Sequence, residues 1–273
     1  MFLIIHFKTN IMHSEKINKF YIFGITLIAT LGGLLFGYDT AVISGAVDPI
    51  KIFFQLDQAH YGDLANFYHG ATVSSALIGC IIGSSLSGLF AVKLGRKNSL
   101  VFAGICFFVS AWGSMYPESW ILTNGKPTFN LLIVFNLYRI LCGIGVGMAS
   151  AICPMYIGEV APSNIRGMLV SWNQFAIIFG QLVVYFVNFI ILGDHANPIY
   201  NAAGAIANMA DAQWTITTGW RYMFGSECIP AAFFTILICF VPETPRYLVM
   251  IKQDEKALNV LSRINGTEQT KEI

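Results

Sequence analysis

The chain has 273 residues, of which 55% are apolar and only 11% are charged, and its formal net charge is +1. Apolar residues gathered in long runs are typical of a membrane protein. Proteins that bind nucleic acid are usually strongly basic, so the near-neutral charge implies no nucleic-acid partner. All six cysteines fall inside these runs, so no disulfide outside the membrane, no metal site and no cofactor are expected.

The runs predict an all-α membrane protein with six transmembrane helices. Each run holds about 20 residues or more, which is enough to cross a hydrocarbon layer of about 30 Å. We expect the spans at residues 20–47, 67–92, 98–117, 129–156, 168–192 and 220–242.

Three segments follow from this assignment. Residues 1–19 are expected to be an N-terminal cytoplasmic tail, which starts at either Met1 or Met12. Residues 20–242 form the six-helix bundle. Residues 243–273 are polar with apolar residues near helical spacing, and they predict one or two amphipathic helices at the cytoplasmic face.

Basic residues indicate the orientation. They precede the first span, lie between spans two and three and between spans four and five, and follow span six, whereas the opposite side has few. By the positive-inside rule, both termini are therefore expected in the cytoplasm.

Asp39 lies within the first span, and we identify it as the only acid in the apolar core of the spans. A carboxylate at membrane depth costs several kcal/mol (roughly 2.5–3.5 kcal/mol on insertion scales) unless it is paired, protonated or facing water. Gly32, Gly33 and Gly37 would let a neighbouring helix approach closely. The alternative is an acid at a helix end, at the outer interface.

Arg139 in the fourth span needs an anion or a water-filled cavity, because its guanidinium stays charged. We expect an Asp39–Arg139 pair across the bundle. If a conformational change separates the two groups, proton binding and conformation become linked. The alternative is that Arg139 extends along the helix to the outer interface.

Gln174 and Gln181 are seven residues apart in the fifth span and therefore share a helix face. Their amides match the hydroxyl groups of a sugar, although interhelical hydrogen bonding is an equally ordinary use. Phe36, one turn before Asp39, is a candidate aromatic surface for a substrate, or simply a residue that faces the lipid or the core.

Acidic and basic residues recur at the inner ends of successive spans, where an ion-pair network could hold the inner side shut. The alternative is that they are solvated charges that only set the topology. The candidates are Arg96, Lys97, Glu159, Arg166, Glu243 and Arg246.

Taken together, these strings resemble the sugar porter family of the major facilitator superfamily. The matches are Gly-Tyr-Asp39, Gly88-x3-Val92-Lys-x-Gly95-Arg96-Lys97, Arg139-x3-Gly-x-Gly-x-Gly147, Glu159-x6-Arg166-Gly167, Gln174-x6-Gln181 and Pro242-Glu-Thr-Pro-Arg246. The family usually has Asp or Asn where this chain has Val92, which places part of the inner network in doubt.

The resemblance implies a sugar symporter driven by protons, with D-xylose as the expected sugar, in the inner (plasma) membrane. Asp39 would be the proton-coupling carboxylate and Arg139 its partner. Phe36, Gln174 and Gln181 would contact the sugar, and the inner charges would form a cytoplasmic gate. Passive carriers of the family tend to have a neutral residue at the position of Asp39, so the acid favours symport.

The family has twelve spans as two six-helix halves, and this chain resembles the first half, built of two three-helix repeats. Its expected partners are a monosaccharide, a proton, the lipid bilayer and a C-terminal six-helix half, and the chain is not expected to transport alone. The alternatives are a fragment or subunit that does not transport, or a passive uniporter. The sequence offers no nucleophile–base pair or phosphate loop, so an enzyme is not expected.

Overall fold

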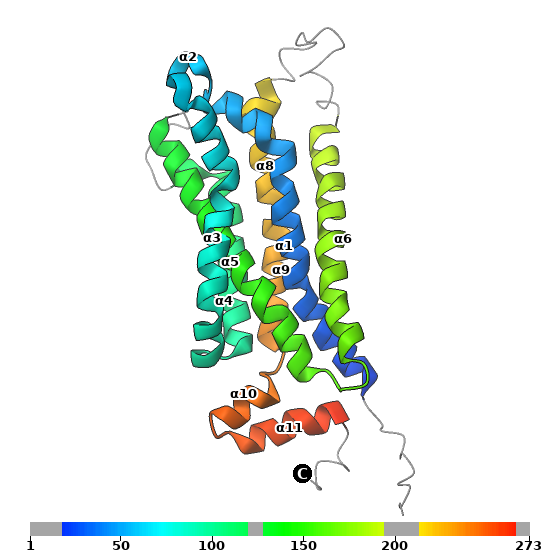
Figure 1. Ribbon diagram of the computed structural model, residues 1–273. Coiled ribbons are helices and arrows are strands. Elements are labelled where there is room, and N and C mark those ends of the chain that lie inside the picture. Colours follow the sequence, from blue (N-terminus) through cyan, green and yellow to red (C-terminus); the bar gives the residue numbers. More distant parts are fainter. Residues whose placement is uncertain (1–17, 120–127, 194–212, 266–273) are drawn as a thin grey trace, which may run out of the picture.

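The computed structural model describes residues 18–119, 128–193 and 213–265 (Figure 1). The N-terminal tail with Met1 and Met12, most of the segment between the fifth and sixth spans, and the last eight residues lie outside the described residues. The elements, in chain order, are α1 (Lys19–Phe53), α2 (Gln58–Tyr61), η1 (Gly62–Leu64), α3 (Ala65–Lys93), α4 (Arg96–Met115), η2 (Pro117–Ser119), α5 (Phe129–Val160), α6 (Arg166–Leu192), η4 (Thr215–Gly219), α8 (Trp220–Ser226), α9 (Cys228–Phe240), α10 (Pro245–Met250) and α11 (Asp254–Asn265).

Six stretches of these helices are long and apolar enough to cross a membrane, which confirms the predicted number. Their bounds are Phe20–Phe53, Gln58–Lys93, Arg96–Met115, Phe129–Val160, Arg166–Leu192 and Thr215–Phe240. All except the third are longer than expected. Hydropathy marks where a helix leaves the apolar layer, but the backbone hydrogen bonds continue until a cap residue ends them.

The spans pack with a recurring pattern of partners. We call α1, α3 and α4 the first set and α5, α6 and the α8–α9 segment the second set. Helix α5 of the second set packs against α3 and α4 of the first set. In the first set, α1 packs against α6 and the α8–α9 segment of the second. Thus α1 and α5, the first helices of the two sets, each contact the second and third helices of the other set. This exchange is the one that two three-helix repeats produce, and the tall bundle in Figure 1 is built from it.

Glycines allow the helices of the two sets to touch backbone to backbone. A Cβ atom at Gly79 of α3 would collide with the carbonyl oxygen of Ile140, and one at Gly143 of α5 would collide with that of Ala76. The glycines of the fourth span therefore allow close packing against α3. Interfaces of small residues are typical where lipid gives no hydrophobic drive for helix association.

The same device joins α1 to α6. A side chain at Gly37 would meet the backbone of Ile177, and one at Gly180 would meet the carbonyl oxygen of Leu34. This contact holds the part of α1 next to Asp39 in register with α6. The expectation that the glycines around Asp39 permit close packing is confirmed.

The two final helices lie across one end of the bundle (Figure 1). Leu248 of α10 and Ala257, Val260 and Ile264 of α11 belong to the same buried cluster as the ends of the spans. The backbone N–H of Asn18, before α1, donates to the carbonyl oxygen of Ile264 at 3.1 Å. The polar segment therefore forms two helices that bury an apolar face against the bundle, as its spacing predicts.

Candidate functional site

Asp39 of α1 and Arg139 of α5 form a hydrogen-bonded ion pair inside the bundle. Nη1 of Arg139 donates to Oδ1 of Asp39, and each residue is 2% exposed. The guanidinium carbon also lies 5.0 Å from the centroid of the Phe224 ring, at a distance typical of a cation–π contact. The structure thus brings the two predicted proton-coupling residues together and buries both.

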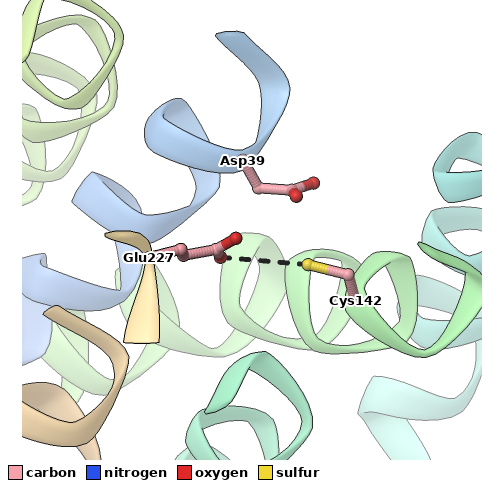
Figure 2. A group of neighbouring side chains, drawn as sticks. All are labelled: Asp39, Cys142 and Glu227. Atoms are coloured by element: carbon pink, nitrogen blue, oxygen red, sulfur yellow. Dashed lines mark hydrogen bonds between the residues drawn. The ribbon is translucent and has the colours of Figure 1, made fainter. Parts of the chain in front are cut away.

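A second acid, Glu227, lies beside this pair, so Asp39 is not the only acid in the apolar core of the spans. Glu227 connects α8 to α9 and is 1% exposed. One oxygen each from Asp39 and Glu227 and the sulfur of Cys142 all lie within 4.8 Å of one another. Figure 2 shows the three side chains converging from α1, the α8–α9 junction and α5.

We call Asp39, Arg139, Cys142 and Glu227 the buried charge cluster. It holds two carboxyl groups and one guanidinium away from water. Burying an uncompensated charge is costly, so the cluster is balanced when one carboxyl group carries a proton. The geometry can therefore bind and release one proton next to a fixed cation.

The same atoms are of types that bind metal ions. Sγ of Cys142 lies 3.9 Å from Oε1 of Glu227, as drawn in Figure 2. However, the guanidinium of Arg139 donates to Asp39, so a positive charge already neutralises one of the acids. A divalent ion would have to compete with that guanidinium, whereas a proton neutralises the remaining acid without displacing it.

A hydrogen bond next to the cluster fixes its two acid-bearing helices. Tyr38 and Ser226 precede Asp39 and Glu227 in the chain, and their hydroxyl oxygens are 2.7 Å apart. No pattern in the sequence singles out this pair, because residues 188 positions apart meet only in the folded bundle.

The three candidate sugar-contact residues lie outside the buried charge cluster. Phe36 is half-buried on α1, Gln174 is exposed on α6, and Gln181 is half-buried on the same helix. Within the part of the chain that the structure describes, neither amide has a hydrogen-bond partner. The amides are therefore free to bind a polar ligand at the surface of this bundle.

Four of the six inner charges form a network at the end of the spans next to α10. Nη2 of Arg96 donates to Oε1 of Glu159 at 2.8 Å, and Nη1 of Arg246 lies 4.0 Å from the same oxygen. Glu243 accepts hydrogen bonds from the backbone N–H groups of Arg96 and Lys97 at 3.1 Å. The network connects the ends of α4 and α5 to α10.

Glu243 caps the start of α4, because Gly95, the residue before this helix, has no side chain that could do so. Gly95 precedes the helix with a φ of 90°, a conformation that favours glycine, and a Cβ there would collide with the Glu243 carboxylate. The carboxylate thus satisfies N–H groups that a helix start leaves free. Burial raises the pKa of Glu243 above its usual value of 4.5, and the N–H donors of Thr244, Lys97 and Arg96 oppose that shift.

Two of the predicted gate residues take no part through their side chains. Among the residues that the structure describes, Lys97 joins the network only through its backbone N–H. Arg166 donates to the carbonyl oxygen of Ala161 at 3.4 Å and has no acidic partner among the residues that the structure describes. Val92, where the resemblance leads one to expect an acid or amide, is exposed at the end of α3 and supplies no polar group.

Comparison with known proteins places this geometry in a family. Residues 25–273 match the model of the family described as "Sugar (and other) transporter", and the chain belongs to that family of transporters, which are not enzymes. It is 49% identical, over 259 residues, to the D-xylose-proton symporter of Escherichia coli, and the match covers 93% of this chain and 50% of that protein. It is 34% identical to the arabinose-proton symporter of Bacillus subtilis over 91% of the chain and 46% of the relative.

Solved structures agree with the sequence comparison. The major facilitator proton:xylose symporter XylE, bound to 6-bromo-6-deoxy-D-glucose, matches with a TM-score of 0.81 and 46% identity over 93% of this chain and 52% of that one. The inward-open XylE of E. coli matches with a TM-score of 0.77 over 92% and 54%. The chain therefore has half of the major facilitator fold and spans about half the length of the relatives it matches.

Proposed function

We propose that the chain is the N-terminal half of a proton-coupled sugar symporter with D-xylose as the favoured substrate. The single observation that carries this proposal is the burial of Asp39 and Glu227 around one guanidinium. A passive carrier has no use for two costly acids at this depth. The relatives that are named as proton symporters, for xylose and for arabinose, support the same assignment.

The buried charge cluster supplies the proton step. In one state Arg139 pairs with Asp39, and the excess negative charge requires a proton on the acid pair. A movement of α1 against α5 that lengthens the Asp39–Arg139 contact favours protonation of Asp39, and its return expels that proton. The glycine contacts of α1 with α6 mean that such a movement also displaces the helix that carries Gln174 and Gln181.

The sugar and gating steps use the remaining candidates. Gln174 and Gln181 offer donors and acceptors to sugar hydroxyls, and Phe36 offers an apolar ring face. The Arg96–Glu159 ion pair and the Glu243 cap join α4, α5 and α10 at the cytoplasmic end, with both termini on that side of the plasma membrane. Breaking these contacts would open the inner side. Most of the sugar site and the opposing wall would come from a second six-helix half.

The test is a fusion of this chain to the remaining half of the E. coli D-xylose-proton symporter, reconstituted into proteoliposomes. With an inward proton gradient, the fusion should accumulate labelled D-xylose. Asp39→Asn should abolish accumulation and retain exchange of labelled for unlabelled xylose, because the carboxyl group that must cycle its proton is gone.

Asp48→Asn is the matched control, since Asp48 is an exposed acid nine residues further along α1. It should accumulate xylose as the parent does. Full accumulation by the Asp39→Asn fusion would exclude the coupling role and favour a passive uniporter. Loss of both accumulation and exchange in a folded parent fusion would instead favour a chain that does not transport.

A further inference from the structure

A groove separates the start of α4 from the two final helices, at the end of the bundle that α10 and α11 cover (Figure 1). Its volume is about 490 Å³. Leu94 and Lys97 lie on the wall formed by the α3–α4 corner, and Lys256, Asn259 and Arg263 of α11 form the opposite wall. None of these side chains belongs to the buried charge cluster.

The groove has an excess of positive charge. Lys97, Lys256 and Arg263 line it, and none of them has an ion-pair partner within the described part of the chain. Its acid, Glu243, is already engaged by the backbone N–H groups of Arg96, Lys97 and Thr244. An anion in the groove would therefore meet three cations and one carboxylate whose oxygens are already hydrogen bonded.

An apolar stripe on α4 begins one helical turn beyond the groove. From Asn98 on its wall, the exposed residues Phe102, Ile105, Val109 and Trp112 follow at spacings of four, three, four and three. Residues at these spacings share one face of a helix. Since α4 is one of the candidate spans, this face runs from the groove toward the interior of the bilayer.

A cationic groove next to a membrane-facing apolar stripe matches the two parts of a phospholipid, its charged head group and its acyl chains. We propose that the groove binds the phosphate of an anionic phospholipid, with its acyl chains along Phe102, Ile105 and Val109. Basic pockets beside transmembrane helices bind such head groups. A free phosphate would use the cations but would gain nothing from the stripe. The site connects α4 to α11, so its occupant would hold the two final helices against the bundle.

The test measures binding of defined phospholipids to the purified 273-residue chain in detergent, by native mass spectrometry. Phosphatidylglycerol should form a one-to-one complex, and phosphatidylethanolamine, which has no net charge, should bind at least fivefold more weakly. Each cation removed should weaken phosphatidylglycerol binding about fivefold, and Lys256→Gln/Arg263→Gln about 25-fold. Lys93→Gln, which removes a lysine at the same end of the bundle but outside the groove, should leave binding unchanged.

Asn259→Asp provides a variant that keeps every cation. It adds a negative charge to the groove wall and should also weaken phosphatidylglycerol binding, with circular dichroism confirming that the helices are intact. Equal binding of both lipids, or undiminished binding by the folded double variant or by Asn259→Asp, would overturn the proposal. Inorganic phosphate that displaces the lipid at equal concentration would identify a free-phosphate site instead and overturn it as well.

Discussion

At the scale of single residues, Arg139 is the group on which the interior charges depend. It neutralises Asp39 directly and lies over the Phe224 ring, while Glu227 and Cys142 complete its surroundings. If the guanidinium is removed, two carboxyl groups remain buried with no ion-pair partner among the described residues. Losing one partner of a buried pair costs far more than the pair contributes, because the remaining charge stays desolvated.

We therefore expect Arg139→Gln to lower the free energy of unfolding by about 3–5 kcal/mol, which is the range for a broken buried pair. The double variant Asp39→Asn/Arg139→Gln should recover at least half of that loss, since only Glu227 then needs a proton. Thermal unfolding of the purified chains in one detergent measures both effects. If the two single losses simply add in the double variant, the residues are not coupled in the folded protein.

The sequence was sufficient to find Asp39 and Arg139 but not to complete their surroundings. Both stand out because each is a charge deep in an apolar run. Glu227 carries the same signal, since it lies inside the predicted span 220–242, and the expectation that Asp39 is the only acid in the core of the spans was therefore wrong. Cys142 carries no signal of its own, because a cysteine in a span is ordinary and only the bundle brings it to the two acids.

At the scale of helices, the contact between α3 and α5 depends on the absence of side chains at Gly79 and Gly143. A methyl group at either position would meet a backbone carbonyl oxygen, which cannot move aside as a side chain can. Gly79→Ala and Gly143→Ala should therefore each destabilise the chain by about 1–3 kcal/mol, as overpacking does.

Gly88→Ala is the matched control, because it lies on α3 with nothing within 4 Å of the position of a new Cβ. It should be neutral or stabilising by up to about 1 kcal/mol, since alanine favours the helix. Thermal unfolding midpoints of the three variants decide the matter. Equal midpoints for Gly79→Ala and Gly88→Ala would show that the helices separate without cost.

Burial of Glu243, and not its hydrogen bonds to the start of α4, makes stability depend on pH. Because burial raises the pKa of Glu243 above 4.5, the folded protein holds this proton more tightly than the unfolded chain does. The stabilising contribution is therefore complete below about pH 4.5 and is lost as the pH rises through the folded pKa. Glu243→Gln should remove this part of the pH dependence.

Unfolding midpoints measured from pH 4 to pH 8 test the effect, with Glu255→Gln as a control at an exposed acid of α11. The control should keep the parent's pH profile. A Glu243→Gln profile that coincides with the parent's would mean that another group governs stability in this range.

The elements themselves were predictable in number and type, and less so in length. Six apolar runs gave six spans, because the bilayer sets a minimum length. The helix ends were not fixed by hydropathy: α1 runs through Pro49 to Phe53, and α5 runs through Pro154 to Val160. The pairing of helices depends on backbone contacts at glycines. The glycines are visible in the sequence, but the helices that they contact are not.

At the scale of the whole molecule, the chain presents a broad apolar surface on α6. Phe175, Ile178, Phe186 and Phe189 are all exposed, and the two glutamines lie on the same helix. A helix that faced lipid alone would have little use for amides. If a second six-helix half forms the opposite wall of a transport path, this wall needs apolar groups that contact a partner helix. It also needs amides that bind a substrate, and α6 carries both.

The chain reconstituted alone should therefore fail to accumulate labelled D-xylose under a proton gradient, because alternating access needs two halves moving about a site between them. Co-expression with the remaining half of the E. coli D-xylose-proton symporter, as a separate polypeptide, should restore accumulation. Vesicles with that remaining half alone are the control and should be inactive. Accumulation by the present chain alone would mean that two copies of it can build the path, and the requirement for a distinct second half would be wrong.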